Sequence, residues 1–324
     1  MKRTFVAEIK EKDLVEAPFL VAEKALVQSR TGLRYIRLKL RDRTGEIEGR
    51  IWERVEENDK VFAKGDFVLV KAEAVRYQGV LQLNILELRT CSKEEVSLED
   101  FVPTSKRHPS EMLEELRALA SKILDPYLRR LVMSFLRDRA FLEAFAKAPA
   151  SRGIHHARSG GLLEHTLSLA KLVERLRGHY EGVDWDLLLC GAILHDIGKV
   201  KEIEGELLYD YSSEGKLLGH IVLGLEMISE RIKAIEGFPE DKAMLLKHLI
   251  ISHHGREEWG SPKKPRTLEA ELLHRLDDLD AKMDGIIELI KKAEGEWTEF
   301  HRAFERSFWR GNFSEDPKGD TSNP

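Results

Sequence analysis

A histidine and an aspartate stand side by side at the end of an apolar run, and they are the strongest chemical feature of the sequence. The uncharged residues 187–194 come first, His195 and Asp196 follow, and Gly198 and Lys199 come soon after. Because the run is apolar on every side, it predicts a helix buried all round and too short to cross a membrane. Gly198 is the expected residue just past a helix end, which puts the pair in the last turn. A buried imidazole and carboxylate are costly unless something neutralises or coordinates them, as a divalent metal does.

Taken alone, such a pair is more often a satisfied core histidine beside a solvated aspartate. Four further predicted helices reverse that balance, because each places a histidine or an aspartate on its apolar face. These side chains are His165, His220, the neighbours His253 and His254, and Asp277. Nitrogen and carboxylate ligands without thiolate fit Mn, Fe, Co or Ni, and they also suit Zn. We therefore expect a metal site, with Asp280 as a support and with His248 and His274 in structural roles.

The composition fits a soluble globular chain that is long enough for two domains. The chain has 324 residues, of which 42% are hydrophobic and 34% charged. The N-terminus runs straight into charged residues and lacks the apolar core of a signal peptide. Cys91 and Cys190 form no disulfide framework and have no metal-ligand spacing, which suits a reducing cytosol. We therefore expect a cytoplasmic protein without a membrane partner.

The net charge of −5 is unevenly distributed along the chain. Residues 1–90 carry 18 Lys and Arg against 15 Asp and Glu, or +3, which leaves −8 for the remainder. A mildly basic front part ahead of an acidic, histidine-rich remainder indicates a division of labour.

Residues 1–90 predict a small closed barrel of about five strands. Aliphatic and basic residues alternate from residue 36 to residue 41, and turns follow at 42–45, 64–66 and 77–79. Such a barrel binds single strands with a basic groove and stacking aromatics. The candidates are the basic row Arg37, Lys39 and Arg41 and the aromatic residues Tyr35, Trp52 and Tyr77. Each of them taken singly is more often part of a solvated strand face or a half-buried barrel aromatic.

The sequence pattern after residue 90 predicts mainly helices. We expect a linker at 91–109, a collar of three helices at 110–149 and an all-helical domain at 150–290. Aromatic residues at spacings of three or four predict a helix at 291–313, which packs in the core or contacts another copy of the chain. The last residues, 314–324, are small and polar, and they predict a disordered tail.

Several of these motifs resemble known families. Residues 160–166, residues 194–199 and Asp277 are similar to the H…HD…D pattern of the HD-domain metal-dependent phosphohydrolases. The turns and strand starts of residues 1–90 resemble an OB-fold of the nucleic-acid-binding kind. The resemblance implies a multidomain fold, in which a small all-β OB barrel at 1–90 is followed by an all-α HD-domain helical bundle.

One family is closer still. Residues 252–263 and 279–283, together with the OB-like front, resemble the YhaM family of 3′-5′ exoribonucleases. The Gly-Tyr-Pro element of cyclic-di-GMP phosphodiesterases is absent after His254, which argues against cyclic-dinucleotide hydrolysis.

The resemblance implies two divalent metal ions, with Mn as the first choice and Fe, Co, Ni, Zn or Mg as others. The implied ligands are His165, His195, Asp196 and Asp277 for the first ion and His220, His253 and His254 for the second. Asp196, with two oxygens, is the natural bridge. Two metals about 3.5–4 Å apart bind a phosphate, lower the pKa of a bridging water and stabilise the departing oxygen.

Other residues are candidates for contact with the substrate. Lys199, which we group with His195 and Asp196 as catalytic, is placed to reach a phosphate oxygen, although a favourable interaction with the helix dipole explains it equally well. Gly160 and Gly161 precede a helix and offer main-chain N–H groups to an anion. Arg158 and Lys263 are weaker candidates for the phosphate backbone.

The implied function is removal of nucleotides from the 3′ end of single-stranded RNA, with single-stranded DNA as a second substrate, and release of nucleoside 5′-monophosphates. Two alternatives remain open. One is an HD phosphohydrolase of free nucleotides whose barrel is regulatory. The other is a nucleic-acid-binding protein with an inactive metal site, against which the full ligand set argues. A homo-oligomer is a further expectation.

Overall fold

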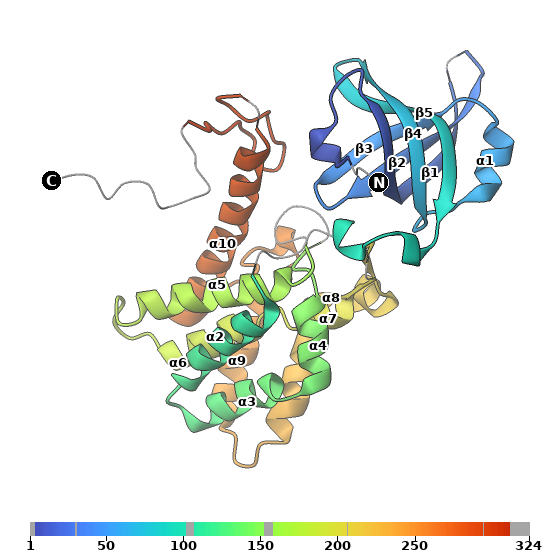
Figure 1. The fold of residues 1–324 in the computed structure, drawn as a ribbon. Coiled ribbons are helices and arrows are strands. Elements are labelled where there is room, and N and C mark those ends of the chain that lie inside the picture. Colours follow the sequence, from blue (N-terminus) through green and yellow to red (C-terminus); the bar gives the residue numbers. More distant parts are fainter. Residues whose placement is uncertain are drawn as a thin grey trace.

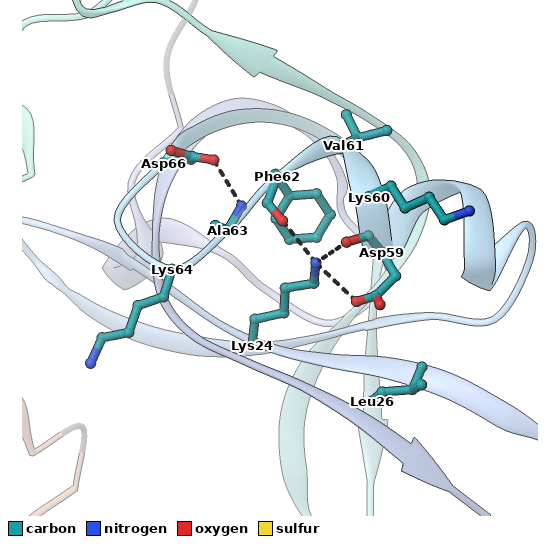
Figure 2. A pocket seen from close by; sticks show the side chains of 9 residues that line it. All are labelled: Lys24, Leu26, Asp59, Lys60, Val61, Phe62, Ala63, Lys64 and Asp66. Carbon is teal, nitrogen blue, oxygen red and sulfur yellow. Dashed lines mark hydrogen bonds and ion pairs between the residues drawn. The ribbon is translucent and has the colours of Figure 1, made fainter.

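The structure is a computed structural model with two parts, a β-barrel and a helical domain (Figure 1). It describes residues 4–29, 31–101, 107–151, 158–205, 207–293 and 295–311. The barrel, in blue and teal, lies at one side of the helical domain, and the long helix α10 (Leu268–Lys292) runs out of the helical domain towards the C-terminus (Figure 1). The predicted fold class is confirmed, because a small all-β barrel precedes an all-α domain.

Five strands close the barrel in the order β1-β2-β3-β5-β4. Their bounds are β1 (Leu14–Gln28), β2 (Arg34–Asp42), β3 (Gly45–Ile51), β4 (Phe67–Tyr77) and β5 (Val80–Cys91), with the short helices η1 (Val6–Glu8) before β1 and α1 (Val55–Val61) between β3 and β4. The predicted turns at 42–45, 64–66 and 77–79 coincide with strand ends or starts, which confirms them.

Strand β2 shows how the sequence pattern builds the barrel. Ile36, Leu38 and Leu40 are buried in the barrel core, and Arg37 between them is exposed. Burying each such aliphatic side chain contributes about 1.5–3 kcal/mol to stability. The register with β3 sets Arg37 opposite Arg50, so the outer face of these two strands carries the polar side chains.

The chain that leaves β5 stays packed on the barrel. It forms the short helices η2 (Lys93–Glu95) and η3 (Leu98–Asp100) and then buries Phe101 completely. The Phe101 ring lies 4.7 Å from the ring of Phe67, and Leu20 completes this small apolar cluster. Leu207 and Leu208 of the helical domain pack against the same cluster. This part of the predicted linker therefore forms the apolar junction between the two parts of the molecule.

The helical domain contains the remaining elements. They are α2 (Pro109–Ser121), α3 (Pro126–Leu136), α4 (Arg139–Lys147), α5 (Gly161–Leu176), α6 (Trp185–Leu194), α7 (Lys199–Glu202), α8 (Ser213–Lys233), α9 (Glu240–Ser252), η4 (Glu257–Trp259) and α10, with a small hairpin of β6 (Ile203–Glu204) and β7 (Asp210–Tyr211). The expected helix start at Thr267 is confirmed, because the Thr267 side chain accepts a hydrogen bond from the Ala270 N–H group at the start of α10.

Helix α6 lies at the centre of this domain. Every residue from 187 to 194 is buried, as the apolar run predicts. A Cβ on Gly191 would lie 2.6 Å from a methyl carbon of Leu249, so the missing side chain lets α9 approach α6 closely. The helices α2 to α4 contribute to the same core cluster as α5, α6, α9 and α10. The predicted collar is therefore part of one continuous core.

The predicted aromatic helix at 291–313 is wrong for the residues that the structure describes. Helix α10 ends at Lys292, and isolated bridges then pair Trp297 with Trp309 and His301 with Arg306 in a short hairpin. Trp297 and Phe300 of the stripe remain 60% and 65% exposed and Phe304 and Phe308 are only half-buried, so the stripe lacks the continuous burial that would favour a helix. The predicted tail at 314–324 lies outside the described residues.

The described helices include none that is both long and apolar enough to span a membrane. Cys91 and Cys190 are both free thiols, and Cys190 is fully buried in α6.

Candidate metal centre

The turn after α6 delivers His195 and Asp196 to the interior, both buried. The prediction that Gly198 lies just past the helix end is wrong, because α6 ends at Leu194 and Gly198, with φ −63°, leads directly into α7. Gly198 has another role. A Cβ there would lie 2.0 Å from the carbonyl oxygen of His220, so only glycine lets α8 come this close to the turn.

Three side chains meet on one side of this turn. His165 comes from α5, His195 follows α6 and Asp277 comes from α10. The Nε2 atom of His165 lies 3.0 Å from Asp277 Oδ1 and 3.2 Å from His195 Nε2. We call these residues the first cluster. All of their candidate ligand atoms lie within 4.8 Å of one another, which is the spacing of donors around one ion.

Three histidines form a second cluster on the other side. His220 lies on α8, and His253 and His254 follow the last turn of α9. Their ring centroids lie 4.4 Å apart for His253 and His254 and 5.1 Å apart for His220 and His254. Their ligand atoms also lie within 4.8 Å of one another.

Asp196 lies between the two clusters. Its Oδ2 atom is 3.3 Å from His195 Nε2, and its Oδ1 atom is 3.4 Å from His220 Nε2 and 3.7 Å from His253 Nε2. Lys199 donates a hydrogen bond to Oδ2 at 2.5 Å. The two carboxylate oxygens of Asp196 therefore face different clusters, as a bridging ligand requires.

A hydrogen bond behind each ring fixes the orientation of all five histidines. The Nδ1 atoms of three of them lie 2.7–3.0 Å from main-chain carbonyl oxygens, which only accept, so these rings carry a proton on Nδ1 and leave Nε2 with its lone pair. Carboxylates hold the other two rings. The partners are Asp280 for His165, the Ala192 carbonyl for His195, Glu202 for His220, the Ile250 carbonyl for His253 and the Trp259 carbonyl for His254.

Among these partners, Asp280 was predicted and Glu202 was missed. Asp280 Oδ2 lies 2.7 Å from His165 Nδ1, which confirms its supporting role. Glu202 Oε1 lies 3.0 Å from both the main-chain N and Nδ1 of His220, and the residue is only 8% exposed. The signal available in the sequence was its place in the short turn after Lys199. His274, expected to be structural, lies with Nδ1 2.9 Å from the His253 carbonyl oxygen.

The pKa shifts of His254 and Asp196 favour the protonation states that bind a metal cation. Burial, followed by the charge of His253, lowers the pKa of His254 to about 4, so this ring is neutral at pH 7 and able to bind metal. Burial disfavours the ionised form of Asp196, but the charge of Lys199 outweighs it and lowers the pKa of this carboxyl. Burial also opposes a charge on His165, but hydrogen bonds with Asp277 and Asp280 raise its pKa to about 10.

Three unpartnered atoms test whether the residues fit a metal. Asp196 Oδ1, His220 Nε2 and His253 Nε2 are buried and have no hydrogen-bond partner among the described residues. A buried polar atom without a partner costs about 1–3 kcal/mol, and here three such atoms point towards one another. Metal coordination satisfies all of them. Imidazole nitrogens and carboxylate oxygens, without a thiolate, are suited to divalent transition metals.

The residues predicted to bind phosphate around α5 have other partners. The prediction for Gly160 and Gly161 is wrong, because their N–H groups donate to the carbonyl oxygens of Lys147 and Arg158 at 3.3 and 2.9 Å. The Arg158 guanidinium itself lies between Glu164, at 2.8 Å, and the α10 residue Asp284, at 3.0 Å. It therefore ties the start of α5 to α10, and its contact with substrate stays a prediction.

The outer face of the barrel gathers the predicted aromatic residues. Trp52 stacks on Tyr35 with ring centroids 4.5 Å apart, and the Arg50 guanidinium lies 5.2 Å from the ring centroid of Tyr77. Trp52 and Tyr77 are 41% and 52% exposed, whereas Tyr35 is only 9% exposed. Trp52 covers the ring of Tyr35, so Tyr35 fits the alternative of a barrel aromatic better than that of a platform. Arg50 was missed, although the β3 alternation sets it on this face.

The predicted basic row is partly neutralised. Arg41 bonds to Glu46 at 2.7 Å, and Lys39 lies 3.1 Å from Glu46 and 3.6 Å from Glu23. Arg37 is exposed, and no acidic partner is seen for it within the described ranges. Lys263, in the helical domain, is also exposed. Among the described residues, the clusters of metal-type ligands contain none of these barrel side chains.

Two domain families match the chain. Residues 162–282 match the HD domain family, and residues 6–90 match the family of OB-fold nucleic-acid-binding domains.

Relatives named 3′-5′ exoribonuclease YhaM match almost the whole chain. The protein from Halalkalibacterium halodurans is 34% identical over 308 residues, which cover 94% of this chain and 95% of the relative. The protein from Bacillus velezensis is 36% identical over 306 residues, covering 92% and 95%. The protein from Bacillus subtilis is 36% identical over 287 residues, covering 87% and 90%.

The support from Glu202 generates a prediction. Changing Glu202→Gln keeps the shape of the side chain but removes the charge behind His220, so the affinity of the second cluster for Mn²⁺ should fall about 10- to 100-fold. Equilibrium dialysis or calorimetry of the purified variant measures this. The exposed neighbour Glu204→Gln is the matched control and should bind as the unaltered chain does. An unchanged affinity in Glu202→Gln would remove Glu202 from the centre.

Proposed function

The chain belongs to the YhaM family of 3′-5′ exoribonucleases, and from this premise we propose that it removes nucleotides from the 3′ end of single-stranded RNA and releases nucleoside 5′-monophosphates. The observation that carries the proposal is the bridging position of Asp196 between two clusters of metal-type ligands. A phosphodiester is anionic and repels hydroxide, so its hydrolysis needs concentrated positive charge.

The arrangement supports two divalent ions. His165, His195 and Asp277 would hold the first, His220, His253 and His254 the second, and Asp196 would contact both. Mn²⁺ is our first choice, and Fe, Co, Ni, Zn and Mg are the others. When bound, such ions supply a Lewis acid for the phosphate and a nucleophilic water at neutral pH.

The side chains themselves have four roles in this mechanism. His195, His253 and His254 present Nε2 lone pairs that the hydrogen bonds at Nδ1 have already oriented, so little reorganisation is needed at these rings. Asp196 stays ionised because Lys199 donates to it. Lys199 also adds a positive charge beside the centre, where the phosphate of the substrate would lie. The buried apolar side chains of α6 directly precede His195 and Asp196, and they exclude water from that side of the centre.

The barrel is proposed to hold the strand. Trp52 and Tyr77 offer exposed aromatic faces, and Arg50 and Arg37 lie opposite each other on the same surface. Aromatic faces accept every base, which suits sequence-independent binding of single strands, including single-stranded DNA as a second substrate.

Two further proposals concern the setting of the protein. The exposed aromatic residues Trp297, Phe300 and Trp309 support association of copies of the chain into a homo-oligomer. The two free cysteines support a cytoplasmic location, because a reducing compartment keeps thiols free. Hydrolysis of free nucleotides, with a regulatory barrel, is the second candidate function and is decided by the products of the experiments below.

The bridging role of Asp196 predicts the effect of its removal. His195→Ala and Asp196→Ala should each lower the rate of RNA hydrolysis by at least about 1,000-fold, because several kcal/mol of transition-state stabilisation are lost. His179→Ala, an exposed histidine outside the clusters, is the control and should retain full activity. A well-folded, chelator-treated Asp196→Ala variant with full activity would refute the metal-dependent mechanism.

Degradation from the 3′ end predicts that a blocked 3′ end protects the RNA. End-labelled RNA with a 3′-phosphate or another blocked 3′ end should be degraded slowly in the presence of Mn²⁺, whereas a blocked 5′ end should have little effect. Products resolved on a gel and identified as nucleoside 5′-monophosphates measure this. Products that shorten from the 5′ end, or cleavage of circular RNA, would contradict the proposal. Hydrolysis of free nucleotides but not of RNA would favour the second candidate function.

Removing the exposed aromatic rings of the barrel should weaken the binding of RNA without changing the metal content. Trp52→Ala combined with Tyr77→Ala should weaken the binding of single-stranded RNA to metal-free protein by at least about 30-fold, because two stacking contacts are removed. Leu14→Ala, an exposed residue on the same barrel, is the control.

Salt dependence provides an independent check on the same surface. Arg37→Ala should flatten the slope of log K against log salt by about 0.7, the value for one phosphate contact on a single strand. Fluorescence anisotropy at several salt concentrations measures both effects. Equal affinity and equal slope in all variants would mean that the strand binds elsewhere.

A further inference from the structure

The indole of Trp259 lies beside the second cluster and takes no part in holding it. Trp259 ends η4, five residues after His254, and its main-chain carbonyl oxygen accepts the hydrogen bond from His254 Nδ1 at 2.8 Å. Any residue type at this position supplies a carbonyl group. The side chain is therefore not needed for the contact with His254, and the residue as a whole is 45% exposed.

The metal centre is partly exposed at three of its candidate ligands. His195 and His253 have fully buried side chains, and the side chain of Asp196 is only 3% exposed. The side chains of Asp277 and His220 are 17% and 12% exposed, and His254 is half-buried. The partly exposed ligands are therefore Asp277, His220 and His254, and the main chain of Trp259 is bonded to the last of them.

Two cations lie over the ring of the indole. The Arg256 guanidinium lies 4.8 Å from the ring centroid of Trp259, and the Lys282 ammonium lies 5.7 Å from it. Lys282 belongs to α10, the helix that also carries Asp277. The ring centroid of His274 lies 6.0 Å away. The indole is thus a partly exposed aromatic ring close to two positive charges that come from different elements.

The charge of the surrounding segment suits an anionic strand. Residues 256–266 contain four basic residues and two acidic ones, and the basic residues Arg256, Lys263, Lys264 and Arg266 are all exposed. Lys282 also pairs with Asp278 at 2.7 Å, so Arg256 is the less constrained of the two cations beside the ring. A partly exposed aromatic ring with neighbouring cations is the combination that binds single-stranded nucleic acid, by stacking on a base and by attraction to phosphates.

We propose that Trp259 is a nucleobase platform at the metal centre: a base near the 3′ end of the RNA stacks on the indole, and Arg256 and Lys282 contact the adjacent phosphates. This inference rests on the proposed function and adds a binding residue to it. Stacking accepts every base, so Trp259 positions the strand without selecting its sequence.

The test combines protein variants with RNA that lacks a single base. Oligonucleotides with an abasic sugar at the last, second-last or third-last position are titrated onto the full-length chain in the presence of chelator, and binding is measured by anisotropy. Trp259→Ala should weaken the binding of intact RNA about 5- to 150-fold, the range for one stacked base. At one of the three positions, the abasic RNA should bind the unaltered chain as weakly, and Trp259→Ala should then cause no further loss.

Two controls separate stacking from structure. Trp259→Phe keeps an aromatic face and should recover most of the affinity, and Tyr180→Ala, an exposed aromatic residue elsewhere in the helical domain, should change nothing. The Mn²⁺ content of Trp259→Ala should equal that of the unaltered chain, because the carbonyl group that holds His254 remains.

The outcomes also separate this inference from the function on which it rests. Unaltered affinity in Trp259→Ala, additive losses at all three abasic positions, or loss of bound Mn²⁺ would overturn the role of Trp259, even if the chain degrades RNA from the 3′ end. If the unaltered chain fails to degrade RNA, the proposed function fails and the platform fails with it.

Discussion

Asp196 has to remain a charged carboxylate inside an apolar helix bundle, and the structure around it serves that requirement. Its two oxygens face two clusters of imidazoles, and Lys199 donates to one of them. Each of the five imidazoles has a hydrogen-bond partner at Nδ1, which fixes the orientation of the ring. The helices are therefore held in place by hydrogen bonds at the centre as well as by the apolar packing of α6, because an unpartnered buried polar atom is costly.

The parts of the site that follow from helical periodicity could be predicted from the sequence. A histidine on the apolar face of a helix faces the interior of the domain. The sequence therefore predicts that His165 and His220 face inwards from their helices, as they do in α5 and α8, and Asp277 lies on the expected helix. Glu202 could not be predicted in this way, because its role depends on the contact between α7 and α8 that Gly198 permits. Likewise, the sequence does not tell whether the N–H group of Gly161 is already bonded to a nearby carbonyl.

In the barrel, period-two alternation predicts the strands well but not the pairing of charges across them. Arg41 and Lys39 look like a basic row in the sequence, yet β3 brings Glu46 against both of them. The surface is therefore less positive than its strand suggests, and aromatic contacts gain importance relative to charge. In the aromatic hairpin after α10, by contrast, the predicted type of secondary structure is wrong. A spacing of three or four fits a helix, but only burial against a neighbour makes such a helix stable.

The apolar junction at Phe101 also limits how the two parts of this protein can be exchanged by protein engineering. Leu207 and Leu208, which pack against Phe101, lie in the hairpin that begins directly after Glu202. One short segment thus contains both Glu202, which orients His220, and the two leucines that pack against the barrel. A chimera that takes its barrel from a relative must take the matching hairpin too, or it leaves two leucines in water beside the residue that orients His220.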